Sequence, residues 1–197
     1  MTSPLPPHPP FKRVAGVVAG VLAVAVSAQL SVPVPGSLVP QSLQTLAVVA
    51  VGGVLGWRRG VAALLLYLCL GTVGLPVFAD GASGMGHLWG PTGGYLAGFV
   101  VGVGVAGWWT TRAASAEWWW PRTTAILAAG FALAHVVMLG IGWARLAAFL
   151  GPAEAWIQGV APFLWGGAVK SVVAAAGAVG WRWWAEPPGP VAGGVAG

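Results

Sequence analysis

The sequence predicts an all-α membrane protein, a bundle of six transmembrane helices with the N- and C-termini in the cytoplasm. Of its 197 residues, 57% are hydrophobic and only 7% are charged, whereas soluble domains carry about 25% charged residues. So few charges cannot cover a water-facing surface, so the surplus apolar side chains must face lipid. The apolar residues form six runs separated by polar breaks, and the basic residues gather on one side of these runs.

The six apolar runs define the predicted spans in chain order. The break at Arg58–Arg59 is short enough for a tight turn. The second run is short for a span and opens with the polar residues Gln41, Ser42 and Gln44. Such a segment favours the lining of a cavity, because irregular backbone is tolerated in a membrane where it borders one. The runs cover about residues 14–30, 43–57, 60–78, 92–110, 123–144 and 160–184.

The two ends of the chain are predicted to be tails. Residues 1–10 hold five prolines, and the C-terminal residues are rich in Pro and Gly. Lys12 and Arg13 precede an apolar stretch as in a signal peptide, but the length of that stretch and the lack of a convincing cleavage site favour a first membrane span. We expect a disordered tail at 1–13, the six-helix transmembrane domain at 14–184 and a second disordered tail at 185–197.

The basic residues are distributed unevenly between the two sides of the predicted bundle. If the N-terminus is cytoplasmic, only Arg145 falls outside, and Lys170 falls within a span. This positive-inside pattern predicts an even number of spans, and tryptophans mark the same inner boundary. The net charge of +5 therefore indicates orientation in the membrane. The sequence lacks the basic stripe with interleaved aromatic residues that is typical of nucleic-acid-binding proteins. The inner residues are Lys12, Arg13, Arg58, Arg59, Arg112, Arg122 and Arg182.

Few residues could carry out catalysis. The four acidic residues lie outside the predicted spans and far apart, which argues against paired-carboxylate chemistry. The three histidines have no ligand-like spacing with one another or with Cys69, so we expect no metal site. The Gly-rich segment 81–94 lacks the G-K-[ST] ending of a phosphate-binding loop. We expect no enzyme activity and no cofactor. For His135, inside the fifth run, a packing role and a site role both stay open.

Lys170 is the main binding candidate. It lies about ten residues into the last apolar run, or roughly 15 Å along a helix. A lysine at the centre of a span costs about 2.5–3.5 kcal/mol. The ammonium either reaches an interface or helix-end carbonyls, or it faces a polar cavity and meets an anionic or carbonyl-bearing ligand.

Small residues recur at four-residue spacing in two places, and such rows let membrane helices approach closely. Glycines from Gly90 to Gly102 lead into the fourth run, and we expect them to pack inside the bundle. Alanines follow one face of the first run, and that face either packs inside the bundle or docks on a partner. The alanines are Ala15, Ala19 and Ala23.

Several segments resemble the BioY biotin transporter family. The most specific are Gly74–Phe78, with the sequence G-L-P-V-F, and Gly90–Tyr95, with G-P-T-G-G-Y, in the family's order and spacing. A weaker match runs from Gly159 to Lys170, and the resemblance covers about residues 14–184. Family members are substrate-binding S components of energy-coupling-factor transporters. The resemblance therefore implies six membrane helices and a vitamin pocket near the outer face, beneath the outward loops.

By this resemblance the chain captures biotin outside the cell and takes part in its uptake across a prokaryotic cell membrane. The expected partners are biotin, membrane lipid, a transmembrane coupling subunit and cytoplasmic ATPase subunits, although the family also includes members that work alone. The resemblance further suggests that the alanine face of the first run docks on a partner.

The resemblance also implies the residues that hold biotin, because Lys170 matches a lysine that the family uses on this vitamin. Biotin has a ureido ring, an apolar bicycle and a carboxylate, so its pocket needs polar and apolar contacts. We expect polar contacts from Gln44, Thr92, Tyr95 and Lys170, and cover for the apolar part from Tyr67, Phe78 and Trp89.

The chain departs from the family beside that lysine. The family usually has an aspartate three residues earlier, where this chain has Gly167, and Ser42 stands where threonine is common. An S component for another vitamin or small metabolite therefore stays open. If bulky Trp165 has reshaped the site, an aspartate at 167 would be a buried, unpaired charge. A membrane-embedded enzyme is a further alternative, but the predicted spans contain no nucleophile or carboxylate pair for it. A purely structural membrane protein is another, but it gives Lys170 no use.

Overall fold

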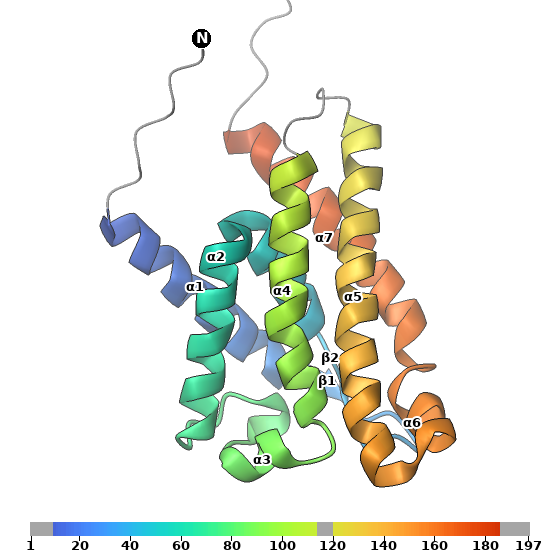
Figure 1. Ribbon diagram of the computed structural model, residues 1–197. Helices are drawn as coiled ribbons and strands as arrows, with labels where there is room; N and C mark the ends of the chain where they lie inside the picture. The colour runs from blue at the N-terminus through green and yellow to red at the C-terminus, as the bar shows by residue number, and fades with distance from the viewer. Residues whose placement is uncertain (1–9, 114–119, 186–197) are drawn as a thin grey trace, which may run out of the picture.

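The computed structural model describes residues 10–113 and 120–185. Within these residues the chain forms seven α-helices, one 3-10 helix and a two-stranded antiparallel β-ribbon. The longest helices run side by side between two ends of a bundle (Figure 1). The predicted all-helical architecture is confirmed, apart from the small ribbon. Of the predicted tails, residues 1–9 and 186–197 lie outside the described residues, whereas residues 10–13 and 185 are helical, so the prediction of a tail is wrong for them.

The elements follow the chain in a simple order. The ribbon joins Ser31 to Ser42 and Val32 to Gln41, so the polar break after the first helix contains regular structure. The elements are α1 (Pro10–Gln29), β1 (Ser31–Val32), β2 (Gln41–Ser42), α2 (Gln44–Thr72), the 3-10 helix η1 (Ala79–Gly81), α3 (Met85–Trp89), α4 (Gly93–Ala113), α5 (Trp120–Leu150), α6 (Pro152–Gly159) and α7 (Phe163–Ala185).

By length and composition alone, and with α2 taken over its full length, four of the described helices are long and apolar enough to cross a membrane, namely α1, α2, α5 and α7. Helix α4 has 21 residues, which also reaches across a hydrocarbon core of about 30 Å. It packs between α2 and α5, so it occupies the middle of the bundle.

Helix α2 contains both the second and the third predicted runs. Gly56 interrupts the helix with φ 74° and ψ 172°. This backbone conformation would be strained for any residue that has a side chain. The two halves fold back on each other there, because a Cβ on Gly60 would lie 3.5 Å from the Cα of Gly52. The predicted turn is therefore present and is centred on Gly56. The second half ends at Thr72 rather than at 78, so the G-L-P-V-F segment lies in a loop.

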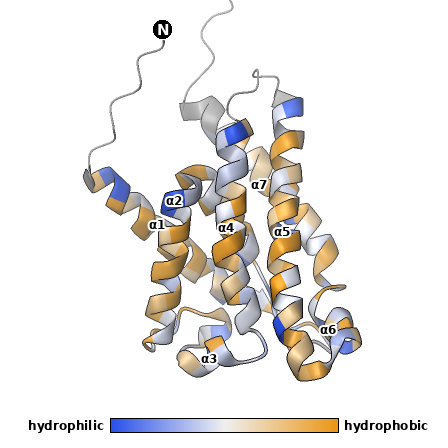
Figure 2. Cartoon of the chain, in the orientation of Figure 1, coloured by the Kyte–Doolittle hydropathy of each residue, from blue (hydrophilic) through white to orange (hydrophobic). Residues whose placement is uncertain are grey.

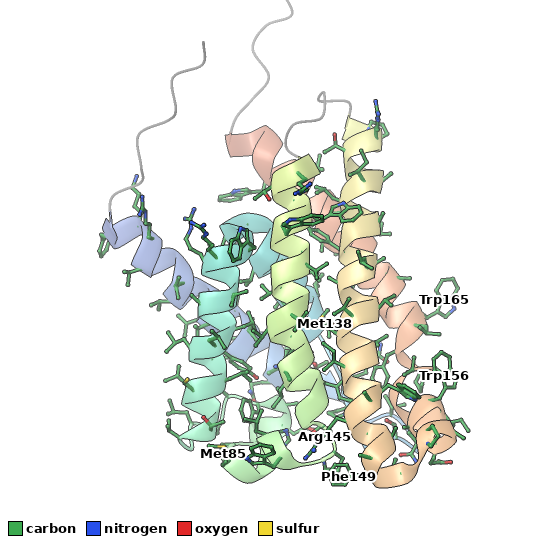
Figure 3. The ribbon with its side chains drawn as sticks, in the orientation of Figure 1. Met85, Met138, Arg145, Phe149, Trp156 and Trp165 are labelled. Atoms are coloured by element: carbon green, nitrogen blue, oxygen red, sulfur yellow. The ribbon has the colours of Figure 1, made fainter. Side chains whose placement is uncertain are left out.

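Small residues bring the helices into close contact. A Cβ on Gly98 of α4 would lie 2.9 Å from the carbonyl oxygen of Met138 on α5, and Met138 itself sits between these helices (Figure 3). Gly94 and Gly102 face α5 in the same way. The predicted packing of this row inside the bundle is confirmed for these three glycines, whereas Gly90 precedes the helix.

The two ends of the bundle differ in character (Figure 2). One end, here called the basic end, carries the start of α1, the bend of α2, the end of α4 and the start of α5. The opposite end, here called the loop end, is formed by residues 30–43, 73–92 and 151–162. The predicted charge asymmetry is therefore a difference between the two ends of one bundle. The described basic residues of the basic end are Lys12, Arg13, Arg58, Arg59, Arg112 and Arg122.

Candidate functional site

A cavity of about 290 Å³ lies toward the loop end of the bundle. Its size is at the lower end of ligand pockets, which run from roughly 300 to 1,000 Å³. The wall is formed by the residues before α2, the first turns of α2, α4 and α7, the middle of α5 and the segment from η1 to α4. Most of the wall is apolar, and the polar groups are few. They come from Ser42, Gln44, Thr45, Asp80, His87, Thr92, Tyr95, His135 and Lys170.

The structure brings four of the seven residues predicted from the sequence to this cavity. These four are the predicted polar contacts, Gln44, Thr92, Tyr95 and Lys170. The three predicted aromatic residues are not in the wall. Tyr67 and Phe78 are fully buried behind it, and Trp89 is 66% exposed on the loop end.

Tyr67 and Phe78 form a layer that supports the wall. The side-chain amide of Gln44 donates to the Tyr67 hydroxyl oxygen at 2.6 Å, and that hydroxyl donates to the carbonyl of Val77 at 2.9 Å. The ring of Phe78 meets the edge of Tyr67 at 5.6 Å and stacks on His87 at 5.3 Å. The two aromatic residues therefore orient Gln44 and His87, which do border the cavity.

Tyr95 and Thr92 hold the part of the wall that precedes and begins α4. The Tyr95 hydroxyl donates to the carbonyl of Gly159 at 2.8 Å, which ties α4 to the end of α6. The Thr92 hydroxyl lies 3.5 Å from Nε2 of His87. Burial lowers the pKa of His87 below its ordinary value, which favours a neutral ring at this edge of the cavity.

Lys170 combines the two roles that the sequence left open. Its Nζ donates to the carbonyl of Ser42 at 2.6 Å and to the Thr45 hydroxyl at 3.2 Å, so it does bond to groups at the start of α2. It also borders the cavity. An ammonium has three N–H donors, so these two bonds leave one donor for a ligand.

Five further polar residues of the wall were not among the predicted binding residues, namely Ser42, Thr45, Asp80, His87 and His135. Asp80 accepts a hydrogen bond from the Ser31 hydroxyl, and His87 stacks on the supporting layer. Asp80 and His87 both lie between the two segments that resemble the BioY family. This position was the only sign in the sequence that they could belong to the site. His135, whose role was left open, is 5% exposed and borders the cavity from α5.

Gly167 borders the cavity next to His135. A Cβ at this position would lie 3.5 Å from Cδ2 of that histidine, which is an ordinary contact. Trp165 is 81% exposed and points away from the bundle (Figure 3). The idea that Trp165 has reshaped the site is therefore wrong, and the space beside Gly167 is open to a small side chain.

The alanine face of α1 points away from the bundle. Ala15, Ala19 and Ala23 are all exposed, while Gly16 and Gly20 on the other side contact α2. The alternative that the alanines pack inside the bundle is wrong. Docking of this face on a partner stays a prediction.

The site can bind a small molecule, and it shows no grouping of residues typical of a metal centre. Within residues 10–113 and 120–185, no three His, Cys, Asp or Glu side chains are close enough to share a metal ion. The apolar wall with a few polar groups suits a ligand that has both an apolar body and polar ends.

Comparison with known proteins agrees with this architecture. The model of the BioY family matches residues 2–186. The chain is 36% identical over 168 residues to "Probable biotin transporter BioY" of Pyrococcus horikoshii, a match that covers 85% of this chain and 92% of that protein. It is 34% identical over 140 residues to "Biotin transporter BioY" of Rhizobium etli, covering 70% of this chain and 74% of that one.

A solved structure has the same fold. The S-component for biotin from an ECF-type ABC transporter superposes with a TM-score of 0.74 and 19% sequence identity. The match covers 89% of this chain and 95% of that one. At this level of identity the likeness concerns the arrangement of the helices.

Proposed function

This chain belongs to the BioY family, and from this membership we propose that it captures biotin at the outer face of the membrane for uptake. The observation that carries the proposal is the cavity at the loop end. Gln44, Thr92, Tyr95 and Lys170 meet around it from distant parts of the chain. Polar groups set in an apolar wall suit biotin, whose apolar bicycle lies between a ureido group and a carboxylate.

In this proposal Lys170 is the main polar contact with the vitamin. Its two bonds to the start of α2 hold the ammonium in place, so little side-chain freedom is lost when a ligand arrives. A hydrogen bond from a charged donor contributes roughly 1.5–3 kcal/mol. Lys170 therefore accounts for a substantial part of the binding free energy.

We place the loop end outside the cell and the basic end in the cytoplasm. The positive-inside rule supports this orientation, and both ends of the described chain lie at the basic end (Figure 1). The six spans are then α1, the two halves of α2, α4, α5 and α7. The cavity lies toward the outside, where biotin is collected.

Transport in this proposal is driven by a transmembrane coupling subunit and cytoplasmic ATPase subunits of an energy-coupling-factor transporter. The sequence has no P-loop of its own. The exposed alanine face of α1 supports docking on the coupling subunit, because small side chains let a partner helix lie close.

A second candidate is another vitamin in the same cavity, and Gly167 is the observation that favours it. The absent carboxylate changes which groups the wall offers to a ligand. The volume of about 290 Å³ supports a small vitamin such as biotin over the larger riboflavin.

A ligand screen tests the proposal. The purified protein in lipid nanodiscs is titrated calorimetrically with biotin, thiamine and riboflavin. We expect saturable binding of biotin alone. Binding of thiamine or riboflavin in the absence of biotin binding would overturn the proposal in favour of the second candidate.

A further inference from the structure

One residue of the cavity wall has a buried polar atom without a partner. His135 borders the cavity, and its Nε2 makes no hydrogen bond within the described part of the chain. Buried polar groups in native proteins are nearly always paired, so an unpaired one calls for an explanation. A ligand in the cavity can supply the missing partner.

The neighbours of the other ring nitrogen determine what Nε2 can do. Nδ1 of His135 lies 2.9 Å from the carbonyl oxygen of Phe131, and a carbonyl can only accept, so Nδ1 carries the hydrogen. The Ser171 hydroxyl lies 3.0 Å from Nδ1 and donates its own hydrogen to the carbonyl of Gly167 at 2.8 Å. Nε2 of the neutral ring therefore has a free lone pair, and it is an acceptor that needs a donor.

Gly167 leaves room for a ligand beside this ring. A side chain at position 167 would begin 3.5 Å from Cδ2 of His135, the carbon bonded to Nε2. Lys170 follows Gly167 by one helical turn, so the two residues share a face of α7. Both Lys170 and His135 border the cavity, so its wall contains a donor, Nζ of Lys170, and an acceptor, Nε2 of His135.

The ureido group of biotin is complementary to this arrangement, because it carries a carbonyl oxygen next to an N–H. The carboxylate of biotin is ionised at neutral pH and has no hydrogen to donate. Of the polar groups of biotin, only the ureido N–H can therefore satisfy Nε2.

We propose that His135 is a specificity residue whose Nε2 accepts a ureido N–H, while Lys170 donates to the ureido oxygen. The ring end of biotin then lies against α5 and α7. The inference rests on the proposed function, since it states how that site recognises its ligand. It predicts that other cyclic ureas with the same N–H and carbonyl edge compete with biotin.

The test is a set of calorimetric titrations in nanodiscs of the wild type, His135→Leu and His135→Gln. The ligands are biotin, the two biotins methylated on one ureido nitrogen, and biotin methyl ester. We expect His135→Leu to weaken biotin binding roughly five- to a hundredfold, because a buried N–H loses its acceptor. His135→Gln should recover most of this loss, since its amide oxygen is an acceptor.

The ligand analogues separate recognition from structure. One of the methylated biotins should bind weakly to the wild type and should lose nothing further in His135→Leu. The methyl ester, which retains both N–H groups, should lose as much as biotin does in His135→Leu. Equal losses for biotin and for both methylated biotins would overturn the inference and assign the ring a structural role.

Unchanged biotin affinity in His135→Leu would also overturn the inference while leaving biotin capture intact. If thermal melting shows that His135→Leu does not fold, the wild-type protein alone decides the matter. Binding of both methylated biotins as tightly as biotin would then overturn the inference. Wild-type protein that does not bind biotin at all would remove the proposed function itself.

Discussion

Replacing Lys170 by methionine removes the ammonium from the cavity wall and keeps a long side chain. The ammonium donates to the Ser42 carbonyl at 2.6 Å and to the Thr45 hydroxyl at 3.2 Å. Losing the short bond destabilises the fold by roughly 1.5–3 kcal/mol, and losing the longer bond by less. The same change relieves the cost of a lysine inside a span, about 2.5–3.5 kcal/mol. Because these terms oppose each other and are similar in size, we expect the melting temperature to move little.

Biotin binding has no such compensation. Lys170→Met removes one hydrogen bond from a charged donor to the ligand, worth roughly 1.5–3 kcal/mol, so Kd should rise about ten- to a hundredfold. Calorimetric titration in nanodiscs measures this change. The matched control is Lys12→Met, the same substitution at an exposed lysine at the basic end, and it should bind biotin as the wild type does.

Two results would refute this reasoning about Lys170. Wild-type biotin affinity in a folded Lys170→Met protein would show that the ammonium does not contact the ligand. A large fall in melting temperature, together with weaker binding, would show that its bonds to the start of α2 are its main role.

Three further predictions follow from the structure. A Cβ at position 167 would lie 3.5 Å from Cδ2 of His135, and the Lys170 ammonium is one helical turn away. Gly167→Asp should therefore stay folded and bind biotin up to about tenfold tighter, as measured by calorimetry. Weaker binding would contradict the pairing of the new carboxylate with the ammonium. Ala19 is exposed, so the Ala19→Trp protein should keep the wild-type melting temperature and biotin affinity. Its uptake of biotin in cells and its co-purification with the coupling subunit should fall roughly five- to a hundredfold. Loss of folding would instead place this face in the core. In a Cys69→Ala background, an impermeant thiol reagent added to whole cells should label Ser83→Cys and spare Arg58→Cys, and the reverse pattern would invert the proposed orientation.

The site was predicted in part because its polar residues stand out against an apolar chain. Gln44, Thr92 and Lys170 interrupt or border apolar runs, so their presence at a cavity could be anticipated. Tyr67 and Phe78 could not be assigned to the wall or to the layer behind it, because aromatic side chains suit both places. That distinction depends on which side of each ring faces the cavity.

The sequence by itself determined the class of protein, the approximate helices and the end of the bundle that carries the basic residues. These properties depend on local composition, because the bilayer selects helices by apolar length and orients them by basic residues. The relevant features are the low charge content, the lengths of the apolar runs and the positions of Arg58, Arg59 and Arg112. The turn between the second and third runs was also predictable, although its centre at Gly56 was not.

Only the tertiary structure decided which faces of the helices meet. It turned Ala19 and Trp165 outward, placed Gly98 against α5, and left Nε2 of His135 unpaired next to Gly167. In a soluble helix the apolar stripe marks the inner face. A membrane helix is apolar on all sides, because lipid and protein interior are similarly apolar, so the pattern does not mark the inner face. The choice of face then depends on shape and on hydrogen bonds between residues far apart in the chain.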